Sequence, residues 1–194
     1  MKDESYKELL KLLKQIPGIT AKQAEKIIYF ILFSDQTYID DLTNILKTFK
    51  QTHKKCIICN NFDKKDICTI CLQRKNANKL LVVLKAEDIQ KFEDLDFFNG
   101  KYFVIEKLIN PVKKISIDQK NIELFLASTE SANEIILALP SNLEGQMTMQ
   151  YLKTLVKDKT KKIYQLSTGI PVGASVDYID PITLIQSLKN KTEV

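Results

Sequence analysis

Cys56-Ile57-Ile58-Cys59 and Cys68-Thr69-Ile70-Cys71 are two Cys-x-x-Cys pairs that together contain every cysteine of the chain. Eight residues separate the two pairs. Each pair can offer two thiolates from one tight turn, and four thiolates complete the tetrahedral shell of a structural zinc ion. The spacing therefore predicts a closed metal knuckle whose ligands are Cys56, Cys59, Cys68 and Cys71.

Disulfide bonds and redox chemistry are the alternative uses of paired cysteines. Disulfides need an oxidising compartment, and the N-terminal sequence MKDESYKELLKLLKQIPG lacks the apolar run and cleavage site of a signal peptide. A redox motif would not need two copies. We therefore expect one Zn²⁺ per chain, with iron as the alternative metal. His53, the one histidine, is interpreted as an exposed linker residue rather than a spare ligand.

The composition indicates a globular protein with a modest basic excess. The chain has 194 residues, of which 44% are apolar, and a net charge of +5, so it can form one large domain or two small ones. Positive charge permits contact with nucleic acid, but it is also ordinary surface solvation. No apolar run has the length that spans a bilayer, so we expect no membrane contact and a cytoplasmic location.

The segment before the cysteines has the apolar spacing of three helices. Pro17 should end the first helix near Ile16. Thr20 and Gln23 form the capping-box pattern that begins the second helix. The third helix should begin near Tyr38, with four apolar side chains turned inward: Leu42, Ile45, Leu46 and Phe49.

The turn between the first two helices, Ile16-Pro17-Gly18-Ile19-Thr20, is typical of a helix-hairpin-helix motif. Gly18 lets the backbone turn tightly, and the amides after Thr20 would face a phosphate at the positive end of the second helix. Lys22 and Lys26 lie one helical turn apart and would add positive charge there. Such a module binds DNA without reading its sequence. An ordinary helical hairpin with a solvated lysine face is the alternative.

Short apolar runs alternate with helical patterns after the cysteines. Strands are expected at residues 80–84, 102–105, 134–139 and 162–166, and helices at 86–97, after Asp118, and from the loop 140–146 to about Lys157. This alternation predicts a parallel α/β sheet, whose binding sites lie at the carboxyl ends of the strands. The loop after Leu139 is therefore the first place to look for function.

The tail contains a loop with two glycines, Gly169–Gly173, and a helix expected to begin near Pro181. The apolar segment Val176–Asp180 is interpreted as a strand that ends in aspartate, a feature that invites a nucleotide-binding interpretation. No Gly-x-x-x-x-Gly-Lys-Ser/Thr motif is present to hold phosphates, so we expect no ATPase activity.

The order of helical hairpin, four-cysteine knuckle, α/β sheet and tail resembles the bacterial recombination mediator family RecR, whose α/β part is a Toprim domain. Its most specific pieces are the cysteine spacing, Asn142-Leu143-Glu144-Gly145 and Gly169-Ile170-Pro171-Val172-Gly173. The resemblance implies an α/β protein with added modules. These are a helix-hairpin-helix DNA-binding module at 1–55, a zinc finger at 56–75, a Toprim-like domain at 79–166, and a Walker-B-like oligomerisation tail at 167–194.

The chain departs from the carboxylate pattern with which Toprim enzymes hold magnesium. Leu84 stands at the end of the first strand, where the RecR family commonly has a glutamate, and Gln146 replaces a second glutamate. Leucine cannot ligate a metal, and Mg²⁺ needs several oxygen ligands. We therefore expect no catalytic residues. Glu144 matches a family glutamate on the acidic face that is associated with partner docking.

The resemblance implies a non-enzymatic DNA-binding scaffold for recombinational DNA repair. It also implies a homotetrameric ring around single- or double-stranded DNA that acts with RecO, and often with RecF, to load RecA on single strands. Two alternatives are kept. One is a magnesium-dependent Toprim-type nucleic-acid enzyme, and the other is a zinc-ribbon RNA-binding or interaction module.

Overall fold

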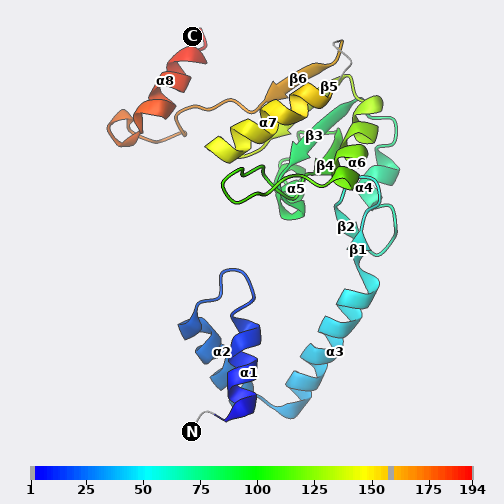
Figure 1. Ribbon diagram of the computed structural model, residues 1–194, viewed down its shortest axis with the longest axis vertical. Coiled ribbons are helices and arrows are strands. Elements are labelled where there is room, and N and C mark those ends of the chain that lie inside the picture. The colour runs from blue at the N-terminus through cyan, green and yellow to red at the C-terminus, as the bar shows by residue number, and fades with distance from the viewer. Residues whose placement is uncertain (1–2, 157–159, 194) are drawn as a thin grey trace. The chain divides into compact units, whose positions relative to one another are not determined.

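The computed structural model describes residues 3–156 and 160–193 (Figure 1). Contacts divide the chain into two units, Met1–Thr52 and His53–Val194, and each unit is described by itself. Within the described ranges, no helix is long and apolar enough to cross a membrane.

The N-terminal unit contains the helices α1 (Glu4–Leu13), α2 (Ala21–Phe33) and α3 (Gln36–Thr52). The predicted capping box is present at the start of α2. The Gln23 amide donates to the Thr20 hydroxyl at 3.3 Å, and the Thr20 amide donates to the Gln23 side-chain oxygen at 2.8 Å. Gly18 has a φ of +84°, in the left-handed region that favours glycine. The hairpin turn therefore forms as its residues predict.

Helix α3 differs from the sequence prediction in its packing. None of its residues is buried. The four side chains expected to point inward are all exposed, with Leu42 at 37%, Phe49 at 52%, Leu46 at 60% and Ile45 at 65%. The prediction of a buried apolar stripe on α3 is therefore wrong within this unit. Helix α2 buries Ala24 and Ile28, but no described segment of the unit covers the apolar side chains of α3 in the same way.

The second unit begins with the knuckle, which consists of the antiparallel strands β1 (Lys54–Lys55) and β2 (Phe62–Asp63) and the short helix α4 (Thr69–Gln73). The Asp63 carboxylate accepts hydrogen bonds from the Thr69 amide and hydroxyl, at 2.9 and 3.0 Å. These bonds lower the pKa of Asp63 and fix the start of α4 next to the second cysteine pair.

The core of the second unit is a four-stranded, wholly parallel sheet. Its strands are β3 (Lys79–Val83), β4 (Lys101–Val104), β5 (Glu134–Ala138) and β6 (Lys162–Gln165), in the order β4-β3-β5-β6. β3 is central and buried on both faces, as its continuous apolar run predicts. The α/β sheet is thus confirmed.

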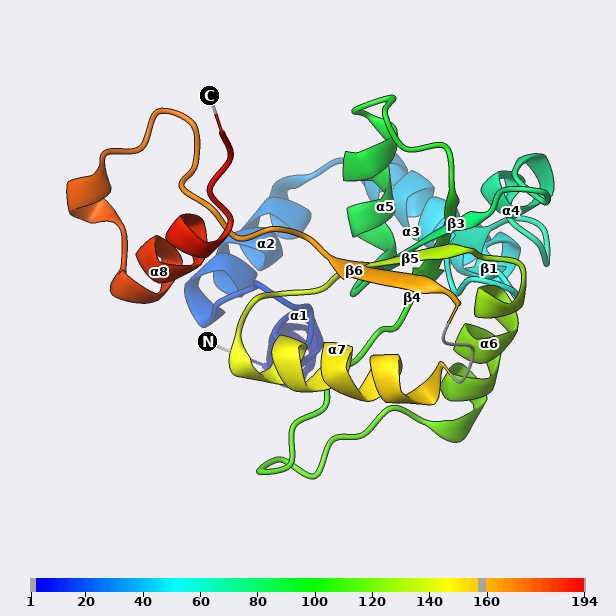
Figure 2. The same ribbon diagram turned by 90° about the horizontal axis from the view of Figure 1, so that it is seen from above.

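Helices cover both faces of this sheet (Figure 2). α6 (Gln119–Glu130) and α7 (Leu143–Leu155) lie on the face that contains Leu80 and Val82, and α5 (Ala86–Glu93) lies on the face that contains Leu81 and Val83. The Asp118 carboxylate caps α6 by accepting from the Asn121 amide at 2.9 Å. The alternation of β3 side chains between two cores explains the three layers.

Three elements differ from their predicted bounds. α5 ends at Glu93 rather than near Phe97, because residues 94–96 form a turn in which Asp96 has a φ of +47°, and Leu95 is 69% exposed. α7 begins at Leu143, inside the expected loop, and its expected end near Lys157 lies outside the described residues. The expected strand before Asp180 is instead a 3₁₀ turn, η1 (Val176–Tyr178), followed by α8 (Pro181–Lys189).

Candidate metal centre and nucleic-acid interface

The four cysteine sulfurs converge as the sequence predicts. All lie within 4.8 Å of one another, and all four residues are buried. The Cys59 and Cys68 sulfurs are 3.6 Å apart, and those of Cys56 and Cys71 are 3.9 Å apart. A tetrahedron with Zn–S bonds of about 2.3 Å has edges of about 3.8 Å. The donors therefore fit a tetrahedral metal ion, whereas a disulfide requires an S–S distance of about 2.05 Å.

The sulfurs differ in acidity because they are packed against each other. A hydrogen bond from the Cys59 thiol lowers the pKa of Cys68. The same hydrogen bond, together with burial, raises the pKa of Cys59. A metal ion would replace these thiol contacts, because it binds cysteine as the thiolate. Among the described residues, no other cluster of three or more histidine, cysteine or acidic ligands is found.

The knuckle is joined to the edge strand β4 by hydrogen bonds that the sequence did not predict. The Val104 amide donates to the Cys59 carbonyl at 2.9 Å. Asn60, which has a φ of +60°, donates to the Val104 carbonyl and to the Asn121 side chain of α6, at 3.0 and 2.7 Å. Asn121 in turn donates to the Ile105 carbonyl at 2.9 Å. The first Cys-x-x-Cys turn therefore continues the hydrogen bonding of the sheet.

Arg74 makes the second connection between the knuckle and the sheet. Its guanidinium pairs with both Glu93 oxygens at 2.8 and 2.9 Å, and donates to the carbonyls of Phe98 and Gly100. Although burial opposes it, the pairing with Glu93 raises the pKa of Arg74. Tyr102 also donates to Glu93, at 2.6 Å. This role was not predicted, because the one sequence signal for it is the position of Arg74 just after the last cysteine pair.

The start of α2 in the helical unit has backbone amides that have no hydrogen-bond acceptor among the described residues. The capping box uses the amides of Thr20 and Gln23. Within the part of the chain that the structure describes, no hydrogen bond is found for the amides of Ala21 and Lys22. The side chains of Lys22 and Lys26 are exposed on the same helix. This arrangement is suited to a phosphate, because free amides and the helix dipole both favour an anion.

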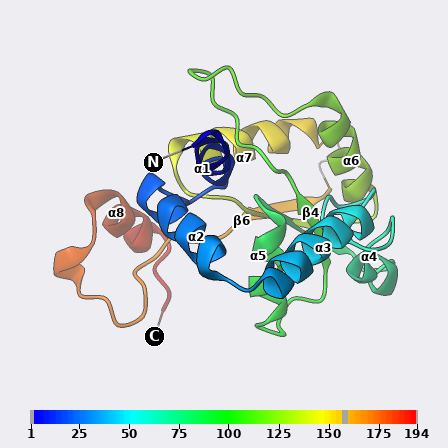
Figure 3. The ribbon, with the colours of Figure 1, turned by 90° about the horizontal axis from the view of Figure 1, so that it is seen from below.

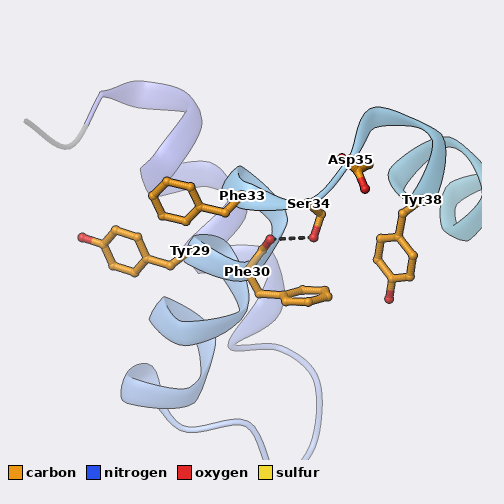
Figure 4. A pocket seen from close by; sticks show the side chains of 6 residues that line it. All are labelled: Tyr29, Phe30, Phe33, Ser34, Asp35 and Tyr38. Carbon is orange, nitrogen blue, oxygen red and sulfur yellow. Dashed lines mark hydrogen bonds between the residues drawn. The ribbon is translucent and has the colours of Figure 1, made fainter.

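Aromatic side chains line an open depression at the other end of α2 (Figure 4). Its volume is about 470 Å³, and its lining combines the end of α2 with the start of α3: Tyr29, Phe30, Phe33, Ser34, Asp35 and Tyr38. The rings of Phe30 and Tyr38 meet edge to face at 5.7 Å. This depression was not predicted, because its aromatic residues lie in two adjacent segments whose turn geometry decides whether they meet.

The carboxyl edge of the sheet holds a cavity of about 500 Å³ beside Leu84, Leu139 and Leu166. The acidic residues at its rim are already paired. Glu87 lies 3.1 Å from the Lys85 ammonium, and Asp88 lies 2.8 Å from that of Lys91. Both belong to the first turn of α5, where negative charge favours the helix dipole. Three leucines and paired carboxylates do not form the oxygen cage that Mg²⁺ requires.

Glu144 lies in the first turn of α7 rather than in a loop. It is half-buried, and its carboxylate accepts from the side chain of Asn110, which is 8% exposed. Asn142 caps the helix by accepting from the Gly145 amide at 2.9 Å. A Cβ on Gly145 would lie 1.8 Å from the Pro140 carbonyl oxygen. The Asn142–Gly145 motif is thus explained by a helix start that tolerates no side chain at Gly145.

Asp180, at the end of the Walker-B-like segment, caps α8. Its carboxylate accepts from the hydroxyl and amide of Thr183, at 2.7 and 3.0 Å, and these bonds lower its pKa. A carboxylate used in this way is not directed at a nucleotide-bound metal. The nucleotide-binding interpretation of this segment therefore has no support in the geometry.

Two family models match this chain. The model for the Toprim domain matches residues 78–167, and the model described as "RecR, C-terminal" matches residues 169–192. Three proteins named recombination protein RecR are similar over nearly their full lengths. The protein from Mycoplasmopsis pulmonis is 35% identical over 98% of this chain and 100% of its own. The protein from Ureaplasma parvum serovar 3 is 36% identical over 100% and 98%, and that from Natranaerobius thermophilus is 32% identical over 96% and 95%.

The two family models agree with the geometry of the parallel sheet and of the tail that ends in α8. The similarity to the named relatives extends through the helical unit as well, because those proteins cover almost every residue of the chain. The chain therefore belongs to the RecR family of recombination proteins.

Proposed function

We propose that the protein is a DNA-binding scaffold in recombinational DNA repair that binds DNA through its N-terminal helical unit. The observation that carries this proposal is the start of α2. Two amides without a hydrogen-bond partner in the described chain, at Ala21 and Lys22, adjoin the exposed side chains of Lys22 and Lys26. Gly18 supplies the left-handed turn that brings the chain to this helix start. Such a site contacts phosphate and not bases.

The metal in this proposal is zinc, one ion per chain, and its role is structural. All four ligand positions would be filled by cysteine, so no position is open for a substrate. The knuckle then holds the first turn, Cys56–Cys59, against β4 through the Cys59 carbonyl. Zinc thiolates persist in a reducing compartment, and a cytoplasmic location is part of the proposal.

An enzymatic function is not part of the proposal. The cavity at the carboxyl edge of the sheet is lined by Leu84 where a Toprim enzyme needs a carboxylate, and Glu87 and Asp88 are paired with lysines. The Glu144 carboxylate, in the first turn of α7, accepts a hydrogen bond from Asn110. Its remaining oxygen can accept from a partner protein, and we propose RecO, with RecF where it is present, as that partner.

The scaffold is proposed to be a homotetramer that loads RecA onto single strands. Several copies of a weak phosphate site on one ring raise the effective concentration of each copy near DNA. The apolar side chains of α8 that are exposed, Ile182, Ile185 and Leu188, are the surface that we propose for subunit contacts in the tail.

The experiment is fluorescence anisotropy with labelled single-stranded and duplex DNA over a range of salt concentrations. Changing both Lys22 and Lys26 to alanine should weaken binding and make the plot of log affinity against log salt less steep by about 2. The matched control changes Lys11 and Lys14 of the same unit. Unaltered affinity in the Lys22/Lys26 variant would remove DNA binding from this helix. Magnesium-dependent DNA cleavage lost on Glu144→Gln would favour the enzyme alternative.

A further inference from the structure

The connection between β4 and α6 carries a second basic feature, which lies on the α/β unit. It contains a small hairpin, residues Asn110–Ile115, closed by backbone hydrogen bonds in both directions between its end residues, at 3.0 and 2.9 Å. Figures 2 and 3 show this connection projecting past α7. We call it the basic hairpin, because Lys113 and Lys114 occupy its tip.

The basic hairpin is ordered by its own hydrogen bonds. The Asn110 side-chain oxygen accepts from the Lys113 amide at 2.9 Å, and the Pro111 carbonyl accepts from the Lys114 amide at 3.2 Å. Pro111 fixes its own φ, which reduces the freedom of the turn. The backbone that carries the two lysines is therefore fixed before any ligand arrives, which lowers the ordering cost of binding.

The base of the hairpin is fastened to α7. The Asn110 side chain donates to Glu144, and the Ile109 amide donates to the Thr148 hydroxyl at 2.9 Å. Thr148 is fully buried and donates to the Glu144 carbonyl at 2.7 Å. Polar groups of Asn110 and Thr148 are thus used to hold an exposed loop on a helix.

The connection that contains the hairpin is rich in lysine, although the Glu144 carboxylate contacts the base of the hairpin through Asn110. Residues 107–120 contain four lysines, at 107, 113, 114 and 120, and one acidic residue, Asp118. The Asp118 carboxylate is used to cap α6. In the described ranges, no ion pair joins any of these lysines to a carboxylate. Val112, at the tip, is 94% exposed, so the tip itself is open to solvent.

We propose that the basic hairpin is a second nucleic-acid contact, at which Lys113 and Lys114 bind the phosphate backbone of DNA. The proposal rests on the proposed DNA binding of the whole protein and adds a site on a different unit. Glu144, at the base of the hairpin, is the proposed protein contact. The tip is assigned to DNA instead, because the centre of a protein interface is depleted of charged side chains, and Val112 is the one strongly exposed apolar side chain beside the two tip lysines. Adjacent exposed lysines that form no ion pair in the described ranges suit phosphates instead.

The test compares two double variants in the full-length, zinc-loaded protein. Lys113→Ala with Lys114→Ala removes the proposed contact, and Lys64→Ala with Lys65→Ala is the control, because these adjacent lysines are also exposed on the same unit. Anisotropy titrations with labelled duplex and single-stranded DNA should show a roughly tenfold weaker affinity for the first variant and a salt slope less steep by about 2. The control should bind as the unaltered protein does.

Each other outcome overturns the proposal in a recognisable way. An equal loss in both variants would mean that only net charge matters. Unchanged binding in the hairpin variant, with weaker binding in the Lys22/Lys26 variant, would remove this site and leave the proposed function standing. DNA binding that is unchanged while an acidic protein partner is lost would assign the hairpin to that partner. No DNA binding by the unaltered protein would remove both proposals.

A direct readout separates contact from indirect effects. A photo-reactive benzoylphenylalanine in place of Val112 should crosslink to DNA upon irradiation, because Val112 lies between Pro111 and the two lysines at the exposed tip. The same group in place of Lys64 is the control and should give little crosslink. A yield at position 112 no higher than at position 64 would contradict the proposed contact.

Discussion

Helix α3 and the knuckle that follows it in the chain obtain order in opposite ways. α3 has 17 residues and a regular apolar stripe, yet none of its residues is buried. α4 has five residues, and it belongs to a knuckle in which all four cysteines are buried. The knuckle has four candidate metal ligands of its own, and it has hydrogen-bond partners on β4, α5 and α6. An amphipathic pattern therefore predicts that a helix has an apolar face, but it does not predict what covers that face.

The largest expected effect is on the knuckle. Cys59→Ser removes one of the four proposed metal ligands, and a bound metal would contribute most of the folding energy of so small a module. The variant should lose zinc and expose the Val104 amide, whose acceptor is the Cys59 carbonyl. Metal analysis and hydrogen exchange at Val104 measure the two effects.

Thr69→Ser is the matched control, because serine retains the hydroxyl that donates to Asp63. This variant should keep its zinc, and the Val104 amide should stay protected from hydrogen exchange. A Cys59→Ser protein that retains full protection of Val104 would contradict the view that the metal holds the knuckle to the sheet. If that protein also kept its oligomeric state but lost DNA affinity, the knuckle would be a contact surface instead.

A smaller effect is expected at the second connection. Arg74→Ala leaves the Glu93 carboxylate, whose side chain is 23% exposed, with Tyr102 as its one remaining donor. Two carbonyls also lose their donor. We expect the free energy of unfolding to fall by about 2–3 kcal/mol, somewhat less than for a fully buried pair. Urea denaturation measures this change.

Lys91→Ala supplies the comparison, because it breaks an ion pair at the same distance of 2.8 Å whose lysine side chain is 74% exposed. An exposed pair contributes little, so the loss should be clearly smaller than in the Arg74 variant. Equal losses in the two variants would mean that the Arg74 pair is no more than a surface ion pair.

Local signals predicted most of the fold. Continuous apolar runs such as Leu80–Leu84 and caps such as Thr20 and Asp118 depend only on neighbouring residues, and each element formed where these signals lie. The errors lie at positions whose local structure depends on residues that are distant in the sequence. Leu95 satisfies the helical spacing, but α5 ends before it. Val176–Tyr178 has the composition of a strand, but it forms a 3₁₀ turn.

The candidate sites show the same division. The cysteine cluster was predictable, because the spacing of two matched Cys-x-x-Cys pairs itself indicates which four side chains come together. The Arg74–Glu93 pair and the Asn60–Asn121 contact were not, because their members are 19 and 61 residues apart. Nothing in the sequence near Asn110 indicates that its side chain reaches Glu144. Single polar residues carry no spacing pattern, so only the folded chain shows which of them meet.

The smallest expected effect is on α3, and it returns to the apolar stripe that this helix leaves exposed. Leu46 is 60% exposed, so Leu46→Ala creates no cavity in the monomer and should change its free energy of unfolding by less than about 0.5 kcal/mol. Denaturation at low and at high protein concentration measures whether this holds. If another subunit covers the apolar stripe of α3 in the proposed tetramer, Leu46→Ala should lower the stability only at high protein concentration. Association contributes to stability under that condition. A loss that is equal at both concentrations would place Leu46 in the core of its own unit, and the contrast between α3 and the knuckle would then disappear.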